Sequence, residues 1–376
     1  MDDSSAPAAS TATTKPLRWK RALRWAAVAV VVALACTAFI LRDYIHTLNS
    51  LRRIPGTNAY VMDYYVDYDI DEVRAHGIDV DRVEDSFLAV FFPDVLLPIA
   101  TWLKSVYLAE RIEAIPAGEH HCSTVVLQTN GGDVYFGRNF DYKHDTCLIL
   151  KTHRPGFPET VSVLDLHYLN MDRDNLEDTS LLQRIPLLFA PYYLQDGMNQ
   201  YGVAVADMSV DEVEPPRDSA KPNVIHSTAM RLILDYAKSA DEAVEILRQF
   251  NVHFVAETCH LIIADASGKS KVVEFIDGEI KTTGTQENWQ VCTNHQLCGK
   301  SEDQNYECCK RYRTASERLA KLSANADSDA VMNVMQSVQQ DSTMWSSVYD
   351  LSSGELRFAY QKHYEQQYRD RIDVSN

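Results

Sequence analysis

Apolar and polar positions alternate along four runs in the middle of the chain, as they do in half-buried strands. The runs cover residues 122–129, 133–142, 147–153 and 159–169. They are rich in β-branched and aromatic residues, and Asn130-Gly131-Gly132 separates the first two. An Asn-Gly pair between two such runs is typical of a tight hairpin turn. The pattern therefore predicts a hairpin followed by two further strands.

A different pattern follows the turn expected at DGMNQYG (196–202) and the strand expected at VAVADMSV (203–210). Residues 226–239 and 240–250 carry apolar side chains at helical spacing, and Ser239 is placed to cap the second helix. Strands are then expected within 260–283 and at 289–294, two helices at 308–324 and 328–340, and a last hairpin at 344–361. This order predicts an α+β fold of stacked antiparallel sheets and helices, not a doubly wound parallel sheet.

The N-terminal region has its own pattern. Five cations, Lys15, Arg18, Lys20, Arg21 and Arg24, precede the uncharged run WAAVAVVVALACTAFIL. As a helix this run spans ~26 Å, near the thickness of a bilayer core. We expect a disordered basic cytoplasmic tail at 1–24, an uncleaved transmembrane signal anchor at 25–42, and the remaining chain outside the cytoplasm. A buried soluble helix and a lipoprotein cleavage box at Cys36 are the alternatives.

A second apolar stretch, FLAVFFPDVLLPIATWLKSVYLAERI (87–112), is interrupted by Pro93, Asp94, Pro98 and Lys104. A charge at the centre of a bilayer is costly, so this stretch does not predict a membrane span. It is expected to form a buried helix of the globular part, with a membrane-apposed helix as the alternative.

Composition narrows the class of protein. The 376 residues are 45% hydrophobic and carry a net charge of −17, which argues against a nucleic-acid partner. The eight cysteines include no CxxC pair, so no zinc site is expected among them. One disulfide is plausible among Cys292, Cys298, Cys308 and Cys309 if the domain lies outside the cytoplasm.

Cys122 opens the first predicted strand, and Arg138 and Asp141 return beside it on the partner strand. A cysteine is a strong nucleophile only as a thiolate, and a nearby arginine lowers its pKa. An aspartate can orient a cationic amine, and Gly137 allows close approach of the backbone. A buried structural cysteine and a metal site formed by His120, His121 and Cys122 are the alternatives.

The spacing Cys-x15-Arg-x2-Asp in CSTVVLQTNGGDVYFGRNFD resembles the signature of the linear amide C–N hydrolases. These N-terminal-nucleophile (Ntn) enzymes include the choloylglycine hydrolases, penicillin V acylases, acid ceramidase, N-acylethanolamine acid amidase and the isopenicillin-N acyltransferase group. The resemblance continues through DGMNQYGVAVADMSV, HLIIADASGKSKVVEFIDG, VCTNH, KRYRTASERL and SSVYDLSSGELRFAY, and so covers residues 122–361.

The resemblance implies a four-layer αββα sandwich and assigns roles to individual residues. Cys122 matches the nucleophile, Asp141 the aspartate that orients its amine, and Asn294 the oxyanion-hole asparagine. The arginines of the family's site match Arg138 and Arg311. Ser209 stands where some members have Asn or Tyr as a second oxyanion donor, so that role is open to Ser209, Asp207 or a backbone N–H. No metal or cofactor is implied.

The resemblance also implies that the chain cuts itself between His121 and Cys122. The freed α-amine, with an ordinary pKa near 8, would then serve as the base for its own thiol. Residues 43–121 would remain as a propeptide or small subunit bound to the catalytic domain, 122–376.

Three functions are compatible with these patterns. The first is hydrolysis of a small-molecule or lipid N-acyl amide through a Cys122 thioester. The second is acyl transfer to an amine by the same residues. The third is a non-catalytic, membrane-anchored binding protein with the same fold.

Overall fold

The computed structural model describes residues 17–83, 121–211, 213–254, 258–284, 287–322 and 326–375. The chain divides into two compact units at Ile45 and His46. The first unit contains helix α1 (Leu17–Ile40) and the start of α2 (Arg42–Asn49). The prediction that the basic tail is disordered is wrong from Leu17 onward, because residues 17–24 consist largely of good helix formers. Residues 1–16 lie outside the described residues.

Many apolar side chains of α1 are exposed, including Trp19, Leu23, Trp25, Val31 and Phe39. Within the part of the chain that the structure describes, no helix is both long enough and apolar enough to cross a membrane. The transmembrane anchor expected at 25–42 is therefore not confirmed.

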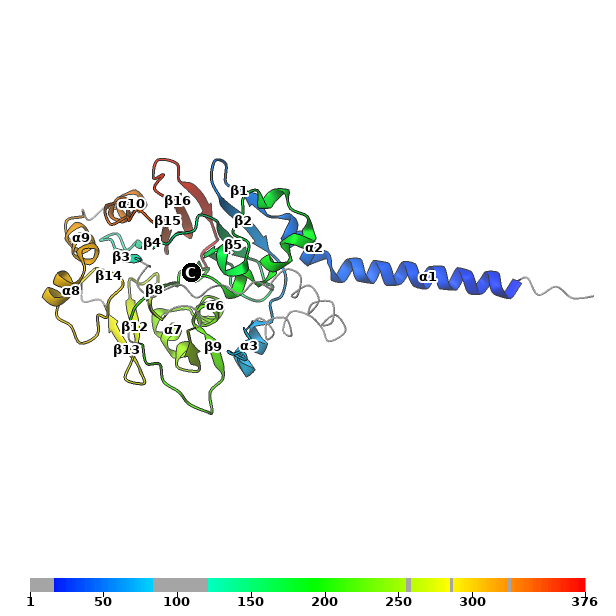
Figure 1. Ribbon diagram of the computed structural model, residues 1–376, viewed down its shortest axis with the longest axis horizontal. Coiled ribbons are helices and arrows are strands. Elements are labelled where there is room, and N and C mark those ends of the chain that lie inside the picture. The colour runs from blue at the N-terminus through cyan, green and yellow to red at the C-terminus, as the bar shows by residue number, and fades with distance from the viewer. Residues whose placement is uncertain are drawn as a thin grey trace, which may run out of the picture. The chain divides into compact units, whose positions relative to one another are not determined.

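The second unit contains two large sheets (Figure 1). The larger sheet has the strand order β1 (Arg52–Arg53), β2 (Ala59–Tyr64), β5 (Cys147–Thr152), β6 (Thr160–Asp165), β7 (Asp196–Asn199), β8 (Ala204–Ser209), β11 (Cys259–Ala264), β12 (Ser270–Ile276) and β13 (Glu279–Gly284). The smaller has the order β14 (Trp289–Cys292), β3 (Ser123–Gln128), β4 (Val134–Asp141), β15 (Thr343–Asp350), β16 (Glu355–Tyr360) and β17 (Tyr368–Arg371). Neighbours in these sheets are antiparallel except β2 and β5. A separate parallel pair joins β9 (Asn223–Ile225) and β10 (Asn251–His253).

The two large sheets enclose a common apolar core, to which the smaller contributes Phe136 and Trp345 and the larger Val163 and Ile262. Helices α9 (Lys310–Leu319) and α10 (Ser328–Ser337) pack on the outer face of the smaller sheet. Helices α6 (His226–Tyr236) and α7 (Ala240–Leu247) contact strands of the larger sheet. The mixed fold with antiparallel sheets confirms the predicted class of fold, helices and stacked antiparallel sheets, at this coarse level.

The segment before Cys122 is part of this fold where it is described. Strand β2 pairs with β5 through the register Ala59–Cys147 to Tyr64–Thr152, and β1 follows at the sheet edge. Helix α3 (Ile70–His76) comes next. The helix predicted at 87–112 lies outside the described residues, as does His120. The division of the chain into 43–121 and 122–376 stays a prediction.

Hairpin β3–β4 has the predicted turn at residues 130–132 and aligns Thr124 with Arg138. The role expected for Gly137 is different in the structure. A Cβ at Gly137 would lie 3.0 Å from side-chain atoms of Val125 and Val331 and 3.1 Å from Met335 Sδ. Because the latter two residues belong to α10, the glycine allows this helix to pack on the sheet, and does not open space for the thiol.

Several other expectations are wrong. Residues 196–199 form strand β7 and only the residues after it turn. The seven described cysteines are all free, so no disulfide joins Cys292, Cys298, Cys308 and Cys309. The alternation did not predict the 3₁₀ helices η1 (Leu166–Leu169), η2 (Leu176–Asp178) and η3 (Leu181–Tyr192), helix α8 (Glu302–Cys308) or strand β17.

Candidate active site

Cys122 lies immediately before β3, between the two large sheets, and is 2% exposed. Arg311, from the first turn of α9, donates a short hydrogen bond to the Cys122 carbonyl and a 2.9 Å bond to Ser123 Oγ. The guanidinium therefore fixes the backbone at the cysteine. Arg311 thus contacts this part of the site through the Cys122 main chain and the Ser123 hydroxyl.

Arg138 joins the two sheets beneath this cysteine. It extends from β4 of the smaller sheet and is fully buried. Its Nη2 donates to Asp207 Oδ1 of β8 at 3.0 Å, and its Nε lies 3.7 Å from Asp196 Oδ2 of β7. Burial disfavours the charged guanidinium, but Cys122 and these two aspartates raise the Arg138 pKa above its ordinary value. A permanent positive charge thus lies inside the core.

Burial raises the pKa of the Cys122 thiol to about 11, although the Arg138 charge acts in the opposite direction. Desolvation opposes the thiolate more strongly than the guanidinium supports it. The Arg138 charge alone therefore does not produce a thiolate at Cys122. In the uncut chain the thiol is protonated at neutral pH, and a base is needed to generate the nucleophile.

Asp141, the last residue of β4, has one satisfied and one unsatisfied oxygen. Thr343 Oγ1 donates to Asp141 Oδ1 at 2.5 Å, whereas the buried Oδ2 has no hydrogen-bond partner. Burial raises the pKa of this carboxyl to about 7, with Thr343, Arg311 and Arg138 acting in the opposite direction. The main-chain N–H of His121 faces the Asp141 carbonyl at 3.5 Å. The buried Asp141 Oδ2 thus lacks a donor, on a residue whose main chain contacts His121 at the expected cut.

Asn294 is held in a fixed orientation after β14. Arg311 Nη2 donates to Asn294 Oδ1 at 3.0 Å, and Asn294 Nδ2 donates to the Ser209 carbonyl at 2.8 Å. An amide nitrogen carries two hydrogens, so one N–H of Asn294 can serve another acceptor. The contact assigns Ser209 a positioning role through its carbonyl. Its role as an oxyanion donor stays a prediction.

The structure thus brings together Cys122, Arg138, Asp141, Asn294 and Arg311. Comparisons with known proteins show what this chain is similar to. Residues 191–364 match the family described as "Acyl-coenzyme A:6-aminopenicillanic acid acyl-transferase". A stretch of 111 residues is 32% identical to the penicillin V acylase of Pectobacterium atrosepticum; it covers 26% of this chain and 29% of that protein.

The fold is similar to that of the conjugated bile acid hydrolase of Clostridium perfringens. For one variant the TM-score is 0.51 at 14% identity over 68% of this chain and 93% of that one. For a second variant it is 0.50 at 13% identity over 68% and 94%. These matches support the resemblance to the choloylglycine hydrolase-like Ntn hydrolases, and the aligned stretch spans less than a third of the penicillin V acylase.

The sequence did not assign partners to the central arginine, Arg138. Asp196 is buried and accepts hydrogen bonds from Trp345 Nε1 at 3.0 Å, Ser347 Oγ at 3.2 Å and Tyr349 Oη. A signal was present at Asp207, because a lone acidic residue in the apolar run VAVADMSV is a candidate for a buried ion pair. The strand itself could not predict that the partner cation, Arg138, lies on the other sheet.

We expect Asp141→Asn to stabilise the uncut chain at neutral and higher pH. The folded-state pKa of about 7 lies above the unfolded value of 3.8, so folding favours the protonated carboxyl. The associated stability is present at low pH and is lost as pH rises from about 4 to about 7. In a Cys122→Ala background, unfolding by urea should show stability falling between about pH 4 and about pH 7 and levelling above that. Asp141→Asn should remove that fall. A pH profile that is the same with Asp or Asn at 141 would contradict the assigned burial penalty.

Proposed function

We propose that this Ntn hydrolase activates itself by cutting the His121–Cys122 bond, and then cleaves a linear amide C–N bond of an N-acyl substrate. The proposal rests on the groups that surround Cys122. The thiol is buried beside the Arg138 cation, and the neighbouring Asp141 Oδ2 lacks a donor. A newly formed ammonium group at residue 122 would supply that donor.

In the activation step the Cys122 sulfur attacks the carbonyl carbon of His121. The C–N bond between the residues breaks, and the thiol proton passes to the departing nitrogen. Water then hydrolyses the thioester, which leaves a carboxylate on His121 and a free amine and thiol on Cys122. Arg311 supports this step by fixing the Cys122 carbonyl and Ser123.

In turnover the α-amine of Cys122 takes the proton of its own thiol. A free amine has an ordinary pKa of about 7.7–8.0, so it can act as a base near neutral pH. Asp141 orients the resulting ammonium group. The thiolate attacks the substrate carbonyl, the amine product leaves with that proton, and water hydrolyses the acyl thioester.

Asn294 stabilises the negative oxygen formed in both halves of turnover. Its amide is oriented by Arg311 and the Ser209 carbonyl, so a second N–H is preorganised. We expect Asn294→Ala to lower kcat by about 10²–10³-fold, the usual loss for one oxyanion donor. Asn288, which bonds the Gln128 carbonyl at an exposed position, offers a matched control. Asn288→Ala should keep wild-type kcat. Equal activity of Asn294→Ala and wild type would remove Asn294 from the mechanism.

The acyl acceptor decides between hydrolase and acyltransferase. Amide hydrolases among the similar proteins favour water, whereas the matched family description names an acyl-transferase. The purified chain should be given phenoxyacetyl and long-chain N-acyl amides, with and without a primary amine, and its products quantified by mass spectrometry. Free carboxylic acid as the main product supports the hydrolase. Preferential formation of the new amide supports the acyltransferase. A chain that cuts neither itself nor any amide would support the non-catalytic function.

A further inference from the structure

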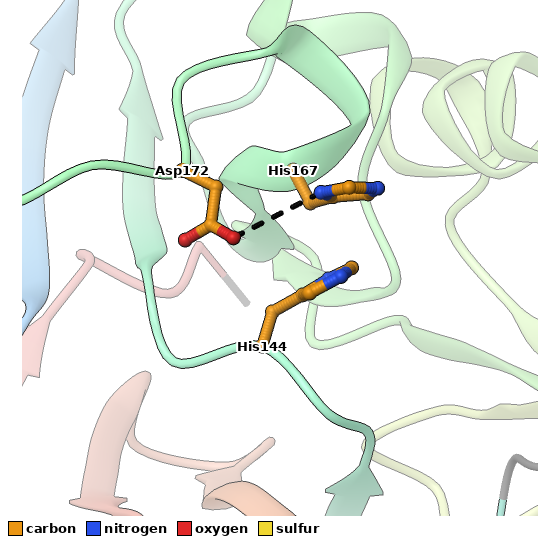
Figure 2. A group of neighbouring side chains, drawn as sticks. All are labelled: His144, His167 and Asp172. Atoms are coloured by element: carbon orange, nitrogen blue, oxygen red, sulfur yellow. Dashed lines mark ion pairs between the residues drawn. The ribbon is translucent and has the colours of Figure 1, made fainter. Parts of the chain in front are cut away.

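A second group of polar side chains lies at the turn that follows β4. It consists of His144 from the β4–β5 loop, His167 from η1 and Asp172 from the loop after η1 (Figure 2). Each offers one ligand atom, and these atoms all lie within 4.8 Å of one another. Figure 2 shows the two imidazole rings lying face to face and the Asp172 carboxylate directed at His167. Two imidazoles and a carboxylate are donors that suit a divalent transition metal.

A buried carboxylate holds both histidine segments in place. His144 Nδ1 lies 2.9 Å from Asp165 Oδ2, and the backbone N–H of His167 donates to Asp165 Oδ1 at 2.9 Å. Asp165 is fully buried. Metal-binding histidines commonly donate their second ring N–H to a carboxylate, which leaves the other nitrogen as a ligand. This contact therefore presents His144 Nε2 as the donor atom.

His167 and Asp172 face each other without a hydrogen bond. His167 Nδ1 lies 3.9 Å from Asp172 Oδ2, which is too long for a hydrogen bond. Two ligands of a tetrahedral zinc ion lie roughly 3.4 Å apart, since each bond is about 2.1 Å. The 3.9 Å between His167 Nδ1 and Asp172 Oδ2 is therefore close to the distance between two ligands of one zinc ion.

We propose that His144, His167 and Asp172 form a site for a divalent transition metal ion, with Zn²⁺ as the ion that fits these donors best. Water would complete a tetrahedral shell. The two rings are stacked with centroids 3.6 Å apart and an interplanar angle of 28°, so one ring must turn out of the stack to bind. The side chains are 17%, 28% and 30% exposed, which gives an ion access from solvent.

The site is structural and separate from turnover. It joins the β4–β5 loop, at His144 three residues after Asp141, to the helix η1, and thereby fixes the end of β4. The sequence analysis expected no metal. The donors are spaced 22 and 4 residues apart, in His144-x22-His167-x4-Asp172, and match no metal-binding motif that a single sequence would reveal.

A second group of possible ligands is less suitable. Asp207, His226 and Cys259 also lie within 4.8 Å of one another. Asp207, however, already pairs with the Arg138 guanidinium at 3.0 Å. A metal cation would compete with the buried Arg138 charge for Asp207, so we do not propose a metal site here.

Zinc binding to the full chain tests the proposal. The protein is treated with a chelator, dialysed and titrated with Zn²⁺ by calorimetry, with metal content measured by plasma mass spectrometry. Wild type should bind one more Zn²⁺ per chain than His144→Gln or Asp172→Asn, or bind that ion at least tenfold more tightly. Zinc should also raise the Tm of wild type by a few degrees. Mg²⁺ should produce neither effect, because it prefers oxygen ligands.

The exposed pair His76–Glu72, with a 3.0 Å contact on α3, provides the matched control. His76→Gln should bind zinc as wild type does. Asp172→Asn removes only a partly exposed carboxylate charge, so it keeps the test valid if the histidine variants fold poorly. Equal zinc stoichiometry and affinity in wild type and Asp172→Asn would overturn the proposal. Either result leaves the assignment of Cys122 unaffected.

Discussion

Cys122→Ala is expected to abolish self-cleavage and amide hydrolysis together, leaving an uncut chain of 42.6 kDa. One sulfur performs both attacks in the proposed mechanism, and its loss removes the base as well, because the α-amine is never released. Removing the nucleophile of a comparable hydrolase lowers kcat by about 10⁶-fold. Gel electrophoresis and the amide assay on the same preparation measure both effects.

Cys147 provides the control for this substitution. It is fully buried in the same core cluster, on β5, and has no place in the mechanism. Cys147→Ala should still cut and still hydrolyse amides, with a modest loss of stability. An uncut Cys122→Ala protein that hydrolyses the substrate at the wild-type rate would show that another residue is the nucleophile.

Arg138→Met is expected to destabilise the fold by about 3–5 kcal/mol, because it leaves the buried Asp196 and Asp207 carboxylates without their cation. The corresponding fall in Tm is on the order of 10 °C. Self-cleavage should also be lost, since the positive charge beside the thiol disappears. Urea unfolding monitored by circular dichroism gives the first quantity, and electrophoresis gives the second.

Arg357 allows the effect of burial to be separated from the loss of an arginine. It lies on β16 of the same sheet and pairs with Asp329, whose side chain is 54% exposed. Arg357→Met should change stability by no more than about 1 kcal/mol. In the other direction, Asp207→Asn added to Arg138→Met should recover part of the lost stability, because one unpaired buried charge is removed. Equal losses for the two arginine variants would contradict the assigned role of the buried pair.

The sequence predicted the elements whose patterns are local. Strands β3 and β4 followed from their alternation and the Asn130-Gly131 turn, and α7 from its apolar spacing and the Ser239 cap, whose Oγ accepts from the Glu242 N–H at 3.2 Å. Each of these signals depends on residues within a few positions of each other. The structure changed their bounds by only a few residues.

Features that depend on the other sheet could not be predicted in this way. Asp196 and Asp207 meet Arg138 only after the two sheets pack, and Gly137 is required by α10, which comes almost 200 residues later. The proximity of Cys122, Asn294 and Arg311 came from the family resemblance, since nothing local to these residues predicted it.

Burial is the other property that single-sequence reasoning did not supply. The charge of Arg138 suggested a low thiol pKa, yet desolvation raises the Cys122 pKa to about 11. The same desolvation raises the Asp141 pKa to about 7. Both shifts indicate a site that is unsatisfied in the uncut chain. Release of an amine at residue 122 would place a base beside the thiol and a cation beside the carboxylate.

The identity of the mature N-terminus tests the account most directly. Intact mass spectrometry and N-terminal sequencing of the purified, active protein should find a fragment that covers residues 122–376 and begins with Cys122. Active protein in which the His121–Cys122 bond is still intact, or whose large fragment begins at another residue, would contradict the account.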